Sequence, residues 1–223
     1  MRAYLHSKEE LTQYFTELTQ TEVREYMRPN LFANTPDILH EYLQEGGRPA
    51  FRVRLLLAAT LSPLYGIYSG YELSENRPVK PGSEEYLDSE KYQLRWRDFD
   101  APGNLDDDIA KLNRVRRAHR ALQVADNLAF VSSENDQLLA FLKLDPEREG
   151  DILVVANVDP HRAHEGMVHV PLDLLGRAPD EAYAVQDLLT GARYVWRGSR
   201  NYVRLDPAQL PGHVFRIERR EAV

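Results

Sequence analysis

The sequence predicts an α/β segment over residues 1–123, followed by an all-β domain over residues 124–223. In the first half, apolar residues recur at helical spacing, and one apolar run that ends at glycine, LSPLYGIYSG, is typical of a short buried strand. Beyond about residue 124 the pattern changes to short runs rich in β-branched and aromatic residues. A hydrophobic fraction of 43% over 223 residues is sufficient for a buried core.

The helices of the first half are expected from their start signals and their apolar spacing. Ser7 and Glu10 form a capping box, because each side chain can satisfy a free backbone N–H of the first turn. Thr35 and Pro36 offer a second start, with threonine as N-cap and proline at the first helical position. We expect helices over four stretches: about 7–18, 35–42, 50–60 and 104–122.

Residues 72–102 interrupt this pattern. The stretch is polar, rich in proline and glycine and without periodicity, and it is too long for an idle connector in a compact domain. We therefore expect it to carry function. The first half contains only one convincing strand, so its apolar helix faces need a sheet that residues 1–123 do not supply. This predicts a part of a larger unit that is marginally stable or self-associating when it is alone.

The second half predicts an antiparallel β-sandwich. Turn clusters such as SEND, DPEREG and LTGA separate its apolar runs. The seven expected strands are LAFVSS, QLLAFLKL, DILVVANV, MVHVPL, AYAVQD, ARYVWRG and HVFRIE. This number of short strands at this spacing is typical of a sandwich.

Composition excludes several classes of protein. A net charge of -7 argues against binding to the phosphate backbone of nucleic acids. The chain has no cysteine, which excludes disulfides and thiolate zinc sites and favours a reducing cytosol. No stretch approaches the roughly 20 apolar residues of a membrane span. We expect a cytoplasmic protein without nucleic-acid or membrane partners.

Two segments contain candidate functional residues, and each also has a simpler interpretation. In MRPNLFANTPDIL, Asp37 lies near the expected helix start, where an aspartate is also favoured by the helix dipole alone. In GSEEYLDSEKYQLRW, Lys91 and Tyr92 lie among aromatic and acidic residues, which also suits a solvated charged loop.

Other candidates have weaker support. Asp159, His161 and His164 have a spacing compatible with metal ligation, but no second cluster completes a site, so no metal is expected. Three aromatic residues either stack on sugar rings or, as we expect, belong to the core and hairpins: Tyr194, Trp196 and Tyr202. No glycine-rich phosphate loop or nucleotide fingerprint is present, and no cofactor is expected.

Four segments together resemble the alpha-1,4-glucan:maltose-1-phosphate maltosyltransferase family, which belongs to glycoside hydrolase family 13 of the alpha-amylase superfamily. They are RPNLFANTPD, GRPAFRVRLLLAATLSPLYGIYSGYEL, GSEEYLDSEKYQ and DLLTGARYVWRGSRNYVRLDP. The resemblance implies that residues 1–123 are the end of a catalytic (β/α)8 TIM barrel and that 124–223 are its β-sandwich C-terminal domain. The chain then corresponds to a C-terminal portion of such an enzyme.

The resemblance also implies roles for individual residues. The segment ANTPD matches the superfamily's Asn-His-Asp motif, with Thr35-Pro36 in place of the usual histidine, so Asp37 is expected to be the transition-state stabiliser. LSPLYGIYSGYE corresponds to the eighth barrel strand and its loop. Lys91, Tyr92 and Asn34 are implied as substrate-binding residues that contact the maltosyl unit.

The implied reaction is the retaining transfer of maltosyl units from maltose 1-phosphate to the non-reducing end of an alpha-1,4-glucan. It needs a nucleophilic carboxylate and an acid–base carboxyl group about 5 to 5.5 Å apart. The family takes both from earlier barrel strands, so we expect this portion to be inactive alone and the full-length enzyme to be a homodimer. Two alternatives remain: another enzyme of the superfamily, such as a trehalose synthase or an amylase, and a non-catalytic glucan-binding β-sandwich.

Overall fold

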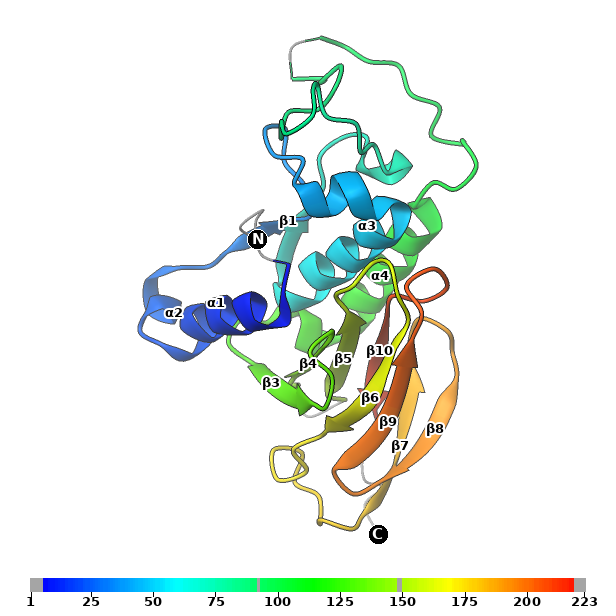
Figure 1. The fold of residues 1–223 in the computed structure, drawn as a ribbon. Coiled ribbons are helices and arrows are strands. Elements are labelled where there is room, and N and C mark those ends of the chain that lie inside the picture. Colours follow the sequence, from blue (N-terminus) through cyan, green and yellow to red (C-terminus); the bar gives the residue numbers. More distant parts are fainter. Residues whose placement is uncertain (1–5, 92, 148–149, 219–223) are drawn as a thin grey trace.

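The computed structural model describes residues 6–91, 93–147 and 150–218 (Figure 1). The helices are α1 (Lys8–Gln20), α2 (Val23–Tyr26), α3 (Glu41–Leu61), α4 (Asp106–Ala118) and the short 3-10 turns η1 (Tyr71–Leu73) and η2 (Arg120–Gln123). The strands are β1 (Asn30–Phe32), β2 (Leu64–Gly66), β3 (Leu128–Ser133), β4 (Leu138–Lys143), β5 (Ile152–Asn157), β6 (His164–His169), β7 (Ala182–Asp187), β8 (Arg193–Arg197), β9 (Arg200–Leu205) and β10 (Gly212–Ile217).

Helix α1 forms as its sequence predicts. The Ser7 hydroxyl accepts a hydrogen bond from the Glu10 amide, and the Glu10 carboxylate accepts one from the Ser7 amide, which completes the capping box. The expected apolar stripe is buried at Leu11, Phe15 and Leu18. The helix therefore packs its apolar face inward and leaves its charged face in water.

The expected helix start at Thr35-Pro36 is wrong. Residues 35–38 form a turn in which Thr35 and Ile38 make an isolated bridge. Helix α3 begins later, with His40 as N-cap, and the His40 ring nitrogen Nδ1 accepts the Tyr42 amide at 3.1 Å. The reason is tertiary: the Leu39 amide, which a helix would use internally, donates instead to a carbonyl oxygen of the long loop at 2.6 Å.

The first half contains two strands rather than one. Strand β1, which the local residue pattern does not predict, pairs in parallel with β2, so that Asn30 lies opposite Leu64 and Phe32 opposite Gly66. The expectation that β2 is buried is wrong, because Leu64 is 59% exposed. Within the described residues this pair has no further neighbouring strand, and its outer edges are left without partners.

The second half is antiparallel, as its sequence predicts, and all seven expected strands are present. They belong to one eight-stranded sheet with the order β8-β7-β10-β5-β4-β3-β6-β9. The eighth strand is β9, which is not among the expected strands and follows β8 after only two residues. A sequence with this spacing looks like the two arms of one hairpin.

Strands β8 and β9 are in fact at opposite ends of the sheet: β8 pairs with β7, and β9 pairs with β6. Gly198, with φ of 66°, provides the left-handed backbone that lets the chain pass from one end of the sheet to the other. The sheet is curled, so that its two ends lie side by side (Figure 1). It encloses an apolar core in the manner of a nearly closed barrel.

Strand β5 shows how the two halves of the chain are joined. All six of its residues are buried, because successive side chains point to opposite faces and both faces are covered. Ile152, Val154 and Ala156 belong to the apolar cluster shared with the helices, whereas Leu153 and Val155 face the inside of the curled sheet. The helical half therefore packs directly on the outer face of the sheet.

Candidate active site

The turn after β1 presents Asp37, whose side chain is 63% exposed. The Lys91 ammonium group contacts the Asp37 carboxylate across 54 positions of sequence. Strands β1 and β2 are parallel, so the segments that follow their carboxyl ends emerge at the same edge. The structure thus brings together two of the residues singled out in the sequence.

Asn34, three residues before Asp37, is only 3% exposed. Its amide nitrogen donates to the Tyr86 hydroxyl at 2.8 Å, and its side-chain oxygen accepts the Tyr68 amide at 2.7 Å. Asn34 therefore ties the segment after β1 to the segment after β2 and to the long loop. A direct contact between Asn34 and a substrate stays a prediction.

Two buried tyrosines, Tyr71 and Tyr86, belong to the segment that follows β2. Burial raises the pKa of Tyr86 to about 12, and burial also raises the pKa of Tyr71, whose hydroxyl donates to the Phe51 carbonyl oxygen at 2.6 Å. Both phenols therefore stay neutral over the ordinary pH range and act as hydrogen-bonding groups. Tyr86 holds the segment that carries Asp37 through its hydrogen bond with Asn34.

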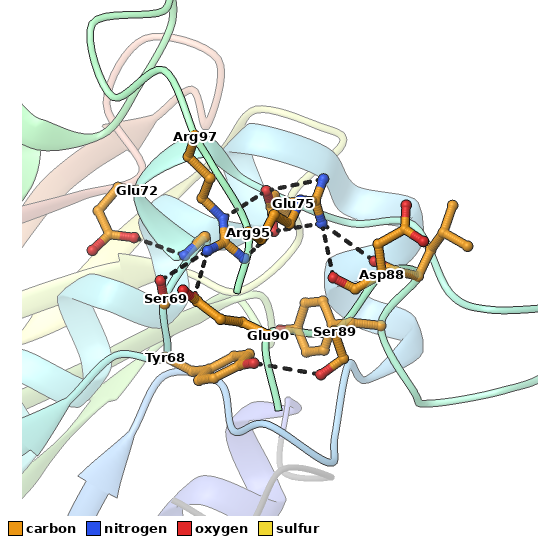
Figure 2. Close-up of polar contacts among 12 residues, drawn as sticks. Tyr68, Ser69, Glu72, Glu75, Asp88, Ser89, Glu90, Arg95 and Arg97 are labelled. Atoms are coloured by element: carbon orange, nitrogen blue, oxygen red, sulfur yellow. Dashed lines mark hydrogen bonds and ion pairs between the residues drawn. The ribbon is translucent and has the colours of Figure 1, made fainter. Parts of the chain in front are cut away.

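The long loop is anchored by an arginine that sequence reasoning missed (Figure 2). The Arg97 side chain is 3% exposed, and its guanidinium donates to both carboxylate oxygens of Glu75 at 3.0 and 3.2 Å. It also donates to the Ser69 hydroxyl at 3.0 Å and to the Glu90 carboxylate at 2.5 Å. Hydrogen bonds from Ser69 and Arg97 lower the pKa of Glu90, which keeps that carboxylate ionised.

Arg95 holds the other arm of the same loop. Its guanidinium donates to the carbonyl oxygens of Leu87 and Asp88 at 3.3 and 3.4 Å and lies 3.4 Å from the Glu75 carboxylate. The intervening side chain of Trp96 is 98% exposed. Arg95 and Arg97 thus face inward while Leu94 and Trp96 face water, but four residues are too few to form a signal in a stretch without periodicity.

The other candidate residues belong to the long loop and to the β-rich half of the chain. Tyr92 lies outside the described residues. The His164 ring lies 2.9 Å from the Asp159 carboxylate, so the first residue of β6 pairs with the turn after β5. Trp196 is 9% exposed and packs in the core, as expected, whereas Tyr194 and Tyr202 are 44% and 53% exposed. No helix in the described residues is long and apolar enough to cross a membrane.

Solved structures with the same fold come from the alpha-amylase family. An alpha-amylase from Geobacillus thermoleovorans matches with a TM-score of 0.68 and 13% identity, over 99% of this chain and 46% of that one. A gamma-CGTase from Alkalophilic bacillus clarkii matches with a TM-score of 0.61 and 17% identity, over 96% of this chain and 30% of that one. At these identities the similarity concerns the fold alone.

Sequence comparison is more specific. A family model described as "GLGE, C-terminal" matches residues 130–217. Alpha-1,4-glucan:maltose-1-phosphate maltosyltransferase 2 of Streptomyces coelicolor is 52% identical over 97% of this chain, and the corresponding enzyme of Chlorobaculum tepidum is 48% identical over 95%. The chain spans 32% of the length of each of these relatives. By sequence, this chain belongs to the alpha-1,4-glucan:maltose-1-phosphate maltosyltransferase family and corresponds to a C-terminal portion of its members.

Proposed function

We propose that this chain supplies the end of the catalytic (β/α)8 barrel and the C-terminal domain of a cytoplasmic, homodimeric maltosyltransferase. The full-length enzyme would transfer maltosyl units from maltose 1-phosphate to the non-reducing end of an alpha-1,4-glucan. The relatives' names and their identity to this chain support the donor and the acceptor. The parallel pair β1-β2 supports the barrel, in which β1 and β2 would be the seventh and eighth strands.

The contact between Asp37 and Lys91 is the observation that carries this proposal. In a (β/α)8 barrel, reacting groups lie beyond the carboxyl ends of the strands, where Asp37 follows β1 and the long loop follows β2. An ionised Asp37 would stabilise positive charge on an oxocarbenium-like transition state. Lys91 and Tyr92 would donate hydrogen bonds to sugar hydroxyls of the maltosyl unit, while Asn34 would contact the substrate or orient the turn.

The reaction needs two further carboxyl groups. In the retaining mechanism one attacks the anomeric carbon as phosphate leaves, and the other acts as acid and then as base. We propose that both come from a preceding part of the full-length enzyme, so that a polypeptide of these 223 residues is inactive by itself. Asp37 would then act only once the complete barrel brings the three carboxyl groups together.

Phosphate release from maltose 1-phosphate in the presence of a maltooligosaccharide tests the proposal. The 223-residue polypeptide and the full-length enzyme that contains it are compared, each with and without Asp37→Asn. We expect turnover only from the full-length enzyme, and a loss of at least about 1000-fold in kcat with Asp37→Asn, because a transition-state interaction is removed. Turnover by the short polypeptide would show that the reacting carboxylates are misassigned.

A non-catalytic glucan-binding role is a second candidate for the β-rich domain. It is favoured by Tyr202, an exposed ring on β9 whose hydroxyl donates to the Glu165 carboxylate at 2.7 Å. Retention on immobilised amylose, lost on Tyr202→Ala, would support this role. Retention that is unchanged by the substitution would argue against Tyr202 as a binding residue.

A further inference from the structure

We propose that Arg97 is a positioning residue that holds Lys91 beside Asp37. The part of this inference that concerns catalysis rests on the proposed function. The part that connects Arg97 with Lys91 rests on the geometry alone. Arg97 acts through Glu90, the residue that directly precedes Lys91.

Arg97 is built as a fixed point. Its side chain is 3% exposed, and its guanidinium donates to both carboxylate oxygens of Glu75, whose side chain is 18% exposed. Two-pronged pairing of a guanidinium with a carboxylate fixes the orientation of both groups. Ser69, in the segment after β2, accepts a third hydrogen bond at 3.0 Å. The guanidinium is therefore held by Glu75 at the start of the long loop and by Ser69 just before it.

From this fixed point, one N–H reaches Glu90 at 2.5 Å. The next residue toward the N-terminus, Ser89, accepts the Lys91 backbone amide at 3.3 Å and lies 3.4 Å from the Tyr68 hydroxyl. The backbone before Lys91 is thus restrained at two successive side chains (Figure 2). A lysine side chain has many rotamers, so the direction of its ammonium group depends on a restrained backbone.

Arg95 completes the restraint by closing the other arm of the loop onto the Leu87 and Asp88 carbonyl oxygens. Arg95 and Arg97 thus hold the residues on the N-terminal side of Lys91, from Leu87 to Glu90. Holding a binding group in place raises affinity without creating a new contact, because less conformational freedom is lost when the substrate binds. Loss of the Glu90–Arg97 contact should therefore weaken binding of the maltosyl donor more than the chemical step.

The test uses the full-length enzyme and a double-mutant cycle of Glu90→Gln with Lys91→Met. Glu90→Gln removes the charge from one contact and leaves the buried Arg97–Glu75 pair intact, so folding should be preserved. We expect Glu90→Gln to raise the KM for maltose 1-phosphate about tenfold with kcat changed less than about threefold. In the Lys91→Met background it should have no further effect on KM, because the positioned group is gone. Glu85→Gln, an exposed glutamate of the same loop, is the matched control.

The proposal would be overturned if the KM increases of the two single variants multiplied in the double variant. It would also be overturned if Glu90→Gln left the KM unchanged. Hydrogen exchange of residues 86–97, followed by mass spectrometry in the same variants, provides a readout that needs no turnover. Faster exchange in Glu90→Gln, but not in Glu85→Gln, supports the restraint, and unchanged exchange refutes it. If the wild-type enzyme released no phosphate, the proposed function would fail, and exchange alone would decide whether Glu90 and Arg97 hold the loop.

Discussion

The Asn34 side-chain amide donates a 2.8 Å hydrogen bond to the hydroxyl of Tyr86, and both groups are almost completely buried. This contact joins the turn that carries Asp37 to the long loop that carries Lys91. Because neither partner can turn to water, the pair fixes the spacing between the two segments. Removing this hydrogen bond should lower the free energy of unfolding even in the absence of substrate.

Tyr86→Phe should destabilise the chain by about 1–3 kcal/mol, because it leaves the buried Asn34 amide without its acceptor. Urea unfolding followed by circular dichroism measures the change. Tyr202→Phe is the control: it removes a hydroxyl from a ring that is 53% exposed, and a change below about 0.5 kcal/mol is expected. Equal effects of the two substitutions would mean that the buried contact contributes nothing specific.

Arg116 of α4 caps the carboxyl end of α3. Its guanidinium donates to the carbonyl oxygens of Ser62 at 3.0 Å and Pro63 at 2.6 Å, and it also contacts the Ala59 carbonyl oxygen. These are backbone acceptors at a helix end that would otherwise lack partners. We expect Arg116→Met to cost about 1–3 kcal/mol of unfolding free energy. Arg117→Met, at the exposed neighbouring position of the same helix, is the control. It should change the free energy of unfolding by less than about 0.5 kcal/mol.

Gly212 is the point where α3 rests on the sheet. A Cβ added there would lie 2.3 Å from the Leu56 side chain and 2.7 Å from the Val155 carbonyl oxygen. Gly212→Ala should therefore push the helix from the sheet and cost about 1–3 kcal/mol or more. Thermal unfolding of this variant, compared with Ala208→Ser at an exposed position of the preceding turn, measures the cost. An unshifted melting temperature would mean that the two halves do not depend on this close approach.

Lys143 should make stability depend on pH. Its side chain is fully buried and donates to the Val124 carbonyl oxygen at 2.8 Å, and burial lowers its pKa from 10.5 to about 7. The unfolded chain then binds a proton that the folded chain lacks between pH 7 and 10.5, so this group's contribution to stability rises with pH in that window. Below about pH 7 both states are protonated and the full cost of the buried charge is present.

Replacing this lysine removes that dependence. The unfolding free energy of Lys143→Met relative to the wild type should fall by on the order of 2 kcal/mol between pH 6 and pH 9. Denaturant unfolding at several pH values gives the difference. Lys80→Met, which removes an exposed lysine, is the matched control. A constant difference for Lys143→Met would indicate that its ammonium group has no lowered pKa.

Much of the fold follows from local sequence signals. The Ser7–Glu10 capping box specifies the start of α1 by itself, because its contacts lie within one turn, and the continuous apolar run of β5 is typical of a strand buried on both faces. The Thr35-Pro36 signal failed for the opposite reason: a contact from the long loop replaced the expected helix hydrogen bond. Local propensity is weak enough to be overridden by one such contact.

By itself, the sequence determined the change from helical to strand periodicity, seven of the eight strands of the sheet and the family, and it proposed Asp37 and Lys91 as candidate site residues. Only the tertiary structure decided that β8 and β9 lie at opposite ends of the sheet, that Lys91 contacts Asp37, and that Arg97 contacts Glu90 next to Lys91. Periodicity records which face of an element is apolar, but it does not record which distant segment covers that face. Contacts between residues far apart in the chain depend on the packing of the whole molecule, and there the local pattern carries no further information.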